Sequence, residues 1–164
     1  MDRNYILTPE IAAKKMKRMA YEILEDNFGE KQFILAGIRE KGLVIARNIQ
    51  SLLNEFSTIS TELLTVNLDK NNPQLVTLDR EIPFRDKVIL LIDDVSNSGK
   101  TLMFALKPFL DSDLKKIQTL VLVERSHNTF PVKPDYVGLS VATTLQEHIF
   151  VEVEGDRIKG AWLE

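Results

Sequence analysis

The stretch VILLIDDVSNSGKTL, Val88 to Leu102, places two adjacent acids directly after an uninterrupted apolar run and follows them with small polar residues and Gly-Lys-Thr. An apolar run without polar positions is typical of a central strand of a parallel sheet, covered on both faces. Asp93 and Asp94 stand where this strand is predicted to end, and open α/β sheets bind ligands at the carboxyl ends of their strands. The stretch therefore predicts both the fold class and a ligand site.

The rest of the chain alternates between strand-like and helix-like patterns. The strand-like segments are QFILAGI (32–38), TELLTVNL (61–68), IQTLVLV (117–123), YVGLSVATT (136–144) and EHIFVEVE (147–154). Three helices are predicted. The first begins at Pro9, with Thr8 as N-cap, and ends by Gly29; the second begins at Gly42. The third begins at Lys100 and is interrupted by Pro108. The polar segment 69–86 is predicted as a loop or a weak hairpin. This alternation predicts an α/β fold with a mostly parallel sheet.

Composition narrows the class of protein. A chain of 164 residues that is 44% hydrophobic and 27% charged is expected to form one globular domain over residues 1–164. A net charge of −3 provides no overall basic field for nucleic acid, and the absence of cysteine excludes disulfides and cysteine nucleophiles. No apolar run approaches the length of a membrane span or resembles a signal core. We therefore expect a soluble, cytosolic protein without a membrane partner.

The two acids distinguish between two kinds of phosphate site. Ser98 to Thr101 resembles the end of a Walker nucleotide loop, but the first glycine of that loop would fall on Asp94, whose charge opposes a triphosphate. A ligand with a diol next to a phosphate fits better, because carboxylates accept hydrogen bonds from hydroxyls and hold Mg²⁺, while a turn of small residues offers N–H groups to phosphate. The alternative, that the acids only cap a helix, leaves one acid and the Ser-Gly-Lys-Thr run unexplained.

An apolar strand followed by two acids, a short turn with glycine, and threonine resembles the phosphoribosyl diphosphate (PRPP) signature of type I phosphoribosyltransferases. The resemblance implies a parallel-rich core sheet flanked by helices, with a small hood from the N-terminal segment and about residues 131–153. It implies Mg²⁺ as cofactor, held by Asp93 and Asp94, with Asp94 also catalytic. The PRPP-binding residues that it implies are Asp93, Asp94, Val95, Ser96, Asn97, Ser98, Gly99, Lys100 and Thr101.

Within these transferases the chain resembles the PyrR family, pyrimidine-operon attenuators that are also uracil phosphoribosyltransferases, from about Ile6 to Val153. The matching segments are TPEIAAKKMKRMAYEILEDN, LAGIREKGLVIARNI and LVERSHNTFPVKPDYVG. The hypoxanthine phosphoribosyltransferases resemble the same segments, but two positions differ from them. Asn97 replaces an aspartate that accepts a proton, and Glu124 replaces a lysine that contacts the purine carbonyl. Uracil is therefore the expected substrate. Asn97 also departs from the PyrR pattern, which has tyrosine there.

The same resemblance assigns the remaining site residues. Arg39, Glu40, Lys41 and Gly42 correspond to the pyrophosphate loop, with a cis peptide bond at Arg39–Glu40 or Glu40–Lys41. Leu68 to Arg85 corresponds to a mobile loop that closes over PRPP. In that loop Lys70 is the candidate catalytic cation against the departing pyrophosphate, the alternative being an ordinary solvent-exposed lysine. The base-binding residues implied are Glu124, Arg125, Val141, Leu145 and Gln146.

The sequence also bears on partners and on rival functions. The basic cluster of Lys14, Lys15, Lys17 and Arg18 lies where the PyrR resemblance implies RNA contacts, but a solvated helix face is the favoured interpretation in an acidic chain. The resemblance also implies a homodimer or a larger homo-oligomer. Two rivals to a uracil enzyme are a hypoxanthine/guanine salvage enzyme and a weakly catalytic regulator that senses PRPP or nucleotides and binds RNA.

Overall fold

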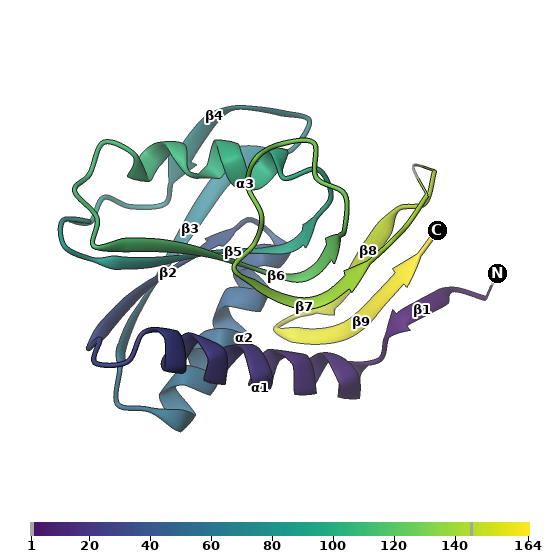
Figure 1. The fold of residues 1–164 in the computed structure, drawn as a ribbon, viewed down its shortest axis with the longest axis horizontal. Coiled ribbons are helices and arrows are strands. Elements are labelled where there is room, and N and C mark those ends of the chain that lie inside the picture. The colour runs from purple at the N-terminus through teal and green to yellow at the C-terminus, as the bar shows by residue number, and fades with distance from the viewer. Residues whose placement is uncertain (1, 145) are drawn as a thin grey trace.

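The structure is a computed structural model that describes residues 2–144 and 146–164. Its centre is a six-stranded sheet in the order β4-β3-β2-β5-β6-β7, in which β4 alone runs antiparallel to its neighbour (Figure 1). The strands are β2 (Gln32–Ile38), β3 (Ser60–Asp69), β4 (Asn72–Leu78), β5 (Val88–Ser96), β6 (Lys116–Arg125) and β7 (Tyr136–Val141). The prediction of an α/β fold with a mostly parallel sheet is confirmed.

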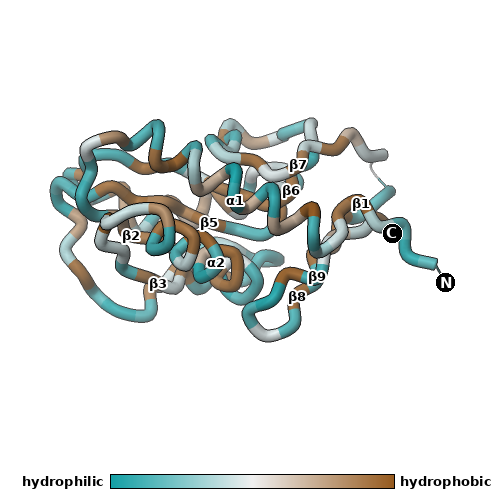
Figure 2. The backbone as a smooth tube through the Cα atoms, turned by 90° about the horizontal axis from the view of Figure 1, so that it is seen from below, coloured by the Kyte–Doolittle hydropathy of each residue, from teal (hydrophilic) through white to brown (hydrophobic). Residues whose placement is uncertain are grey.

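Helices cover both faces of this sheet. Helices α1 (Pro9–Asp26) and α2 (Lys41–Phe56) lie on one face, and the short α3 (Lys100–Ala105) with the 3-10 turn η1 (Lys107–Phe109) lies on the other (Figure 1). Two apolar cores result, one between the sheet and α1 with α2, the other between the sheet and α3. The tube in Figure 2 is accordingly hydrophobic along the central strands. Burial on both faces explains why β5 carries no polar residue before Asp93.

The helix ends follow the local sequence signals. The hydroxyl Oγ1 of Thr8 accepts a hydrogen bond from the backbone N–H of Ile11 at 3.2 Å, and Pro9 is the first helical residue of α1. Helix α3 ends at Ala105, before Pro108, as a proline inside the helical pattern requires. Capping and proline geometry therefore account for these boundaries.

A second, three-stranded antiparallel sheet forms the hood beside the core (Figure 1). It consists of β1 (Asn4–Leu7), β9 (Arg157–Leu163) and β8 (Ile149–Glu154), in that order. The expected hood boundaries, the N-terminal segment and residues 131–153, need correction. Strand β7 is the parallel edge strand of the core sheet, and the middle strand of the hood is β9, which the sequence pattern did not predict. Strand periodicity identifies β7 as a strand but does not say which sheet it joins.

Strands β3 and β4 form a hairpin where the resemblance places a mobile loop. Its turn consists of Lys70 and Asn71, and Asp69 pairs with Asn72 across it. A carboxylate oxygen of Asp69 accepts a hydrogen bond from the backbone N–H of Asn71 at 2.9 Å, as short polar side chains do in turns. Of the two predicted forms, loop or hairpin, the structure has the hairpin.

Across residues 2–144 and 146–164, no helix combines the length and the apolar character that crossing a membrane requires.

Candidate active site

The two acids lie near the carboxyl end of β5, in the middle of the core sheet. Strand β5 pairs with β2 on one side and β6 on the other, so its backbone is fixed by both neighbours. Asp93 is completely buried and Asp94 is 6% exposed. A buried carboxylate is costly unless it is paired, and these two are adjacent in the chain. The site must therefore supply a cation or hydrogen-bond donors.

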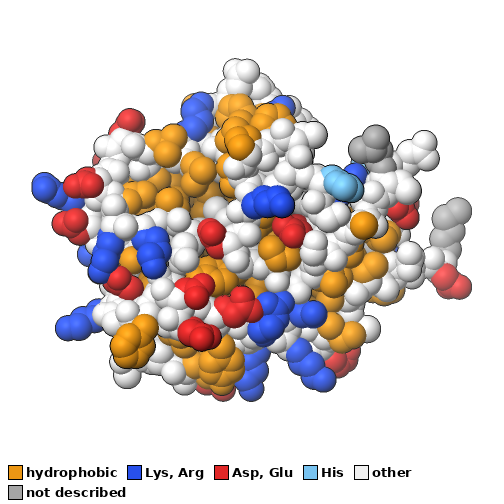
Figure 3. Space-filling view, viewed as in Figure 1, with side chains coloured by type: hydrophobic (Ala, Val, Ile, Leu, Met, Phe, Trp, Pro, Cys, Tyr) orange, Lys and Arg blue, Asp and Glu red, His pale blue; other side chains and the backbone are white. Residues whose placement is uncertain are grey.

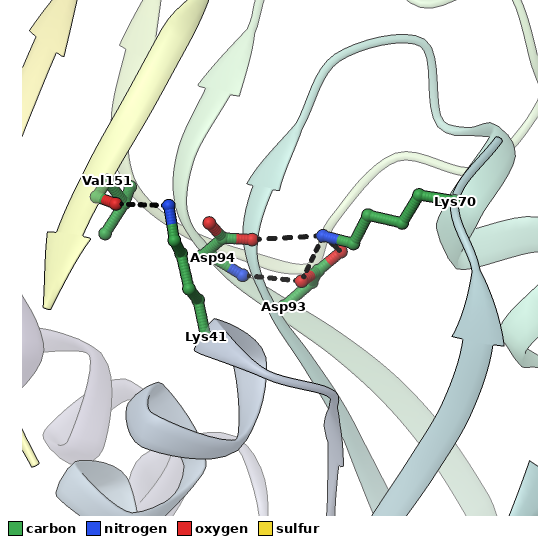
Figure 4. A network of polar contacts seen from close by, with 5 residues as sticks. All are labelled: Lys41, Lys70, Asp93, Asp94 and Val151. Carbon is green, nitrogen blue, oxygen red and sulfur yellow. Dashed lines mark hydrogen bonds and ion pairs between the residues drawn. The ribbon is translucent and has the colours of Figure 1, made fainter. Parts of the chain in front are cut away.

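Lys70 supplies the cation (Figure 4). Its ammonium Nζ lies 3.1 and 3.2 Å from the two carboxylate oxygens of Asp93 and 3.2 Å from Oδ1 of Asp94. Burial lowers the pKa of Lys70, but the charges of Asp93 and Asp94 outweigh burial and raise that pKa above its ordinary 10.5. Burial and the charge of Asp94 raise the pKa of Asp93 well above its ordinary 3.8, and Lys70 offsets only part of this shift. The structure thus brings the three predicted residues together.

A cavity of about 170 Å³ opens beside the acids. The segment from Asp94 to Thr101, which resembles the PRPP signature, lines one side of it together with Lys41 and Lys70. Gly99 is essential to this turn because its φ is +88° and because a Cβ there would lie 2.8 Å from the carbonyl oxygen of Val132. The carbonyl of Ser98 accepts hydrogen bonds from the N–H groups of Thr129 and Phe130, at 3.1 and 3.0 Å. The turn is therefore held against segment 129–132.

The four residues of the predicted pyrophosphate loop lie in different surroundings. The peptide bond Arg39–Glu40 is cis, as the resemblance implies. Lys41 lines the cavity and donates from Nζ to the carbonyl of Val151 in the hood at 2.7 Å (Figure 4). Gly42 packs directly against the backbone of β5 beside Asp93. Arg39 and Glu40 are exposed and line an adjacent groove instead of the cavity. The loop thus approaches the acids through Lys41 and Gly42.

The predicted base-binding residues lie outside the wall of this cavity, so far as the structure describes them. The guanidinium of Arg125, at the end of β6, donates to the carbonyl oxygens of Thr144 and Glu147. Val141 packs against the core on the α1 side, Gln146 is exposed, and Leu145 lies outside the described residues. Arg125 therefore holds the segment that leads from the core sheet into the hood.

Glu124 lies at the same edge of the core sheet as the acids. Its neighbours across the strands are Ser96 of β5 and Ser140 of β7. The hydroxyl of Ser96 is buried and, within the described part of the chain, has no hydrogen-bond partner. The carboxyl ends of β5, β6 and β7 thus form a polar edge next to the cavity.

The hood supplies three cavity residues that sequence analysis missed, Ile149, Phe150 and Val151 of β8. The ring of Phe150 stacks on that of Trp162 in β9, with centroids 5.6 Å apart and planes at 18°. The guanidinium of Arg3 lies 4.2 Å from the centroid of Trp162 on β9. The apolar alternation in EHIFVEVE indicates a strand, but Phe150 and Trp162 are brought together only by the antiparallel pairing of β8 with β9. Phe150 is therefore the aromatic residue that the hood places at the cavity, and Trp162 packs against it from the neighbouring strand.

The donor set fits Mg²⁺ only if a substrate completes it. Among residues 2–144 and 146–164, no three His, Cys, Asp or Glu side chains gather into a metal-binding group. Asp93 and Asp94 provide two neighbouring carboxylates, and Mg²⁺ is commonly bound by one or two carboxylates together with substrate phosphates and waters. A Mg²⁺ ion shared between these acids and oxygens of a ligand is compatible with this arrangement.

The basic cluster on α1 is partly engaged in contacts within the chain. Arg18 donates to the carbonyl oxygens of Val137 and Gly138, both at 2.9 Å, and pairs with Glu22. The ammonium of Lys17 lies 5.5 Å from the ring centroid of Phe56. Arg18 thus satisfies carbonyl groups of the edge strand β7, which is a structural role.

Comparison with known proteins agrees with this geometry. The model of the phosphoribosyl transferase domain family matches residues 3–155. A bifunctional protein PyrR of Latilactobacillus sakei is 34% identical over 149 residues, which cover 84% of this chain and 83% of the relative. A bifunctional protein PyrR of Clostridium novyi is 33% identical over 164 residues, covering 93% and 92%.

Solved structures show the same fold at low sequence identity. The hypoxanthine phosphoribosyltransferase of Trypanosoma cruzi superposes with a TM-score of 0.78 at 14% identity, covering 99% of this chain and 96% of that one. A hypoxanthine-guanine phosphoribosyltransferase of Bacillus anthracis has a TM-score of 0.74 at 18% identity, covering 91% and 86%. We conclude that the chain belongs to the type I phosphoribosyltransferase family, in the branch of the PyrR proteins, and is a phosphoribosyltransferase, a pentosyltransferase enzyme.

Proposed function

We propose that this phosphoribosyltransferase converts uracil and PRPP to uridine monophosphate and pyrophosphate. The observation that carries the proposal is the joint placement of two unlike groups on one cavity. The carboxylate of Asp94 lines the cavity, that of Asp93 lies buried beside it, and both suit the ribose hydroxyls. The turn from Val95 to Thr101 lines the same cavity and suits the 5′-phosphate. A ligand with a diol and a phosphate at opposite ends satisfies both.

Different residues around the cavity would bind different parts of the two substrates. Asp93 and Asp94 accept hydrogen bonds from the ribose, which orients C1. Lys41, at the start of α2, lies where its charge can meet the pyrophosphate, and Phe150 offers its ring to the base. The ring nitrogen N1 of uracil attacks C1 while the bond from C1 to the pyrophosphate oxygen breaks. The bonding electrons leave with pyrophosphate, and the proton of the N1–H is released to solvent. Positioning supplies much of the rate, because the nucleophile belongs to the substrate.

Mg²⁺ is part of this proposal. When bound, it would neutralise charge on the pyrophosphate oxygens. Asp93 and Asp94 are the residues that would hold it, together with oxygens of PRPP.

The base is proposed from two side chains, Asn97 in the wall of the cavity and Glu124, whose neighbour across the strands is the cavity residue Ser96. Asn97, in the turn, cannot accept a proton at neutral pH, so it cannot serve a purine as a base. Glu124 cannot donate a hydrogen bond to a purine carbonyl, and its charge would repel that oxygen. A mismatched polar partner in a dry pocket costs about 1–3 kcal/mol, roughly ten- to hundredfold in specificity. Glu124 disfavours hypoxanthine and guanine directly, and Asn97 lacks the proton acceptor that the resemblance gives the hypoxanthine enzymes at this position.

Turnover of PRPP with a panel of bases tests the proposal. Uracil, hypoxanthine and guanine are each offered with PRPP and Mg²⁺, and Asp93→Asn with Asp94→Asn serves as the inactive control. We expect the highest kcat/KM with uracil. Efficient conversion of hypoxanthine or guanine, with none of uracil, would assign the protein to purine salvage. PRPP binding without turnover of any base would favour a sensing regulator.

We also propose a homodimer or larger assembly and a solvated α1 face. The exposed Arg39 and Glu40 beside the start of α2 are available to a second copy. Light scattering that finds only an 18.7 kDa species at micromolar concentration would contradict the assembly.

On the face shown in Figure 3, basic and acidic side chains are interspersed, which supports a solvated surface over an RNA-binding one. Salt-sensitive RNA binding lost on Lys14→Glu with Lys15→Glu would show that RNA is a partner.

A further inference from the structure

Lys70 occupies the position that a ligand of the acid pair needs. Its ammonium contacts both carboxylate oxygens of Asp93 and one of Asp94, all between 3.1 and 3.2 Å. These are the oxygens that would accept hydrogen bonds from ribose hydroxyls or bind a cation. With the ammonium in this position Asp93 has no exposed surface, so a ligand reaches its oxygens only when the ammonium moves.

The other lysine beside the acids is held elsewhere. The Nζ of Lys41 is 2.7 Å from the carbonyl of Val151, and it points to the hood in Figure 4. Among the described residues, Lys70 is the only cation paired with Asp93 or Asp94. The charge balance of the buried pair therefore depends on one side chain.

The side chain of Lys70 is also able to move away from the acids. Its side chain is 44% exposed, whereas that of Asp93 is fully buried. It extends from the turn of the β3–β4 hairpin, whose geometry is stabilised by the contact of Asp69 with the N–H of Asn71. Rotation of the lysine side chain can thus vacate the acids without disturbing β5.

We propose that Lys70 is an internal cation that neutralises Asp93 and Asp94 in the free protein and competes with ligands for them. Binding of a ribose phosphate, or of a divalent cation, requires Lys70 to leave, which frees its charge for the pyrophosphate end of the substrate. The identity of the sugar ligand rests on the proposed function, whereas the competition itself does not. The proposal predicts opposite effects on stability and on affinity: removing Lys70 destabilises the free protein but strengthens ligand binding. A merely structural lysine would weaken both.

The test compares Lys70→Met and Lys70→Arg with the wild type. Two probes that lack pyrophosphate are titrated by calorimetry: ribose 5-phosphate without metal, and Mn²⁺ alone. Because neither probe has a pyrophosphate for Lys70 to bind, the change in affinity reports only the competition for the acids. We expect Lys70→Met to bind each probe about tenfold more tightly or better, because one charge-assisted contact no longer competes. Lys70→Arg keeps the cation and should bind like the wild type. Urea unfolding of the free protein should show a lower midpoint for Lys70→Met.

A matched control removes the same charge elsewhere. Lys115 pairs with Glu30 at 2.6 Å, immediately before β6 and therefore at the opposite edge of the sheet from the acids. Lys115→Met should leave the affinity for both probes unchanged. If Lys70→Met does not fold, Lys70→Gln is carried through the same comparison.

The outcomes separate this proposal from the function. Equal or weaker binding of both probes by the Lys70 variant, or no binding of either probe by any variant, overturns the competition. Tighter Mn²⁺ binding by Lys70→Met with no binding of ribose 5-phosphate by any variant supports the competition and contradicts the proposed substrate class.

Discussion

Gly42 and Asp93 lie so close together that a Cβ on Gly42 would be 3.0 Å from the Cα of Asp93 and 3.1 Å from its carboxylate oxygen. The same Cβ would lie 2.7 Å from the carbonyl oxygen of Ile92, closer than real Cβ atoms approach backbone. The start of α2 and the end of β5 are thus in direct backbone contact. This contact places the predicted pyrophosphate loop against the predicted ribose acids.

We predict that Gly42→Ala weakens PRPP binding as well as stability. The methyl group would have to push α2 away from β5, and overpacking of this kind costs about 1–3 kcal/mol. Calorimetric titration and urea unfolding measure the two effects. Gly29→Ala is the control: Gly29 has a φ of +88° with open space around it, so alanine there should lower stability and leave PRPP affinity unchanged. Unchanged PRPP affinity in Gly42→Ala would contradict the proposed role of this contact.

The raised pKa of Asp93 predicts a pH dependence of stability. A carboxyl whose pKa is higher in the folded than in the unfolded protein favours folding when it is protonated, and that contribution is lost as pH rises from the ordinary 3.8 through the raised folded value. Asp93→Asn should therefore gain stability relative to the wild type as pH increases above 3.8, by at most about 1.4 kcal/mol per pH unit. Urea unfolding of both proteins between pH 4 and 8 measures this. A difference that does not change with pH would argue against a raised pKa.

Phe150 should determine the affinity for the base. Phe150 is one of the residues that line the cavity, and its ring is stacked on that of Trp162, which limits its motion. Stacking of a base on an aromatic side chain contributes about 1–3 kcal/mol. We predict that Phe150→Ala raises KM for uracil roughly tenfold or more, with little change in KM for PRPP, whereas Phe150→Tyr stays near the wild type. An equal increase in both KM values would indicate a general disturbance of the hood.

The parts of the fold that local sequence determines could be predicted. The apolar run before Asp93 identifies the central strand, Thr8 and Pro9 mark the start of α1, and Pro108 limits α3. The acid pair and the following turn could be predicted for the same reason, since their chemistry lies within one short stretch. Residue type and spacing are sufficient there.

The parts that depend on distant pairing could not be predicted. The hood has β9 as its middle strand, paired with β1 and β8. No local sequence pattern identifies the strands with which β9 pairs. The stacking of Phe150 on Trp162 depends on that pairing. The contacts of Arg125 with the carbonyl groups of Thr144 and Glu147 likewise depend on the path of the chain between β7 and β8. The family resemblance implies that Arg125 contacts the base, whereas in the structure its guanidinium donates to backbone carbonyls.

The central claim, that Asp93 and Asp94 bind the ribose of PRPP, is tested most directly by calorimetric titration of PRPP with Mg²⁺ into the wild type and into Asp93→Asn with Asp94→Asn. Each charge-assisted hydrogen bond contributes about 1.5–3 kcal/mol, so we predict that the double variant loses about a hundredfold or more in affinity while its circular dichroism stays that of a folded protein. Unchanged PRPP affinity in a folded double variant would contradict the account.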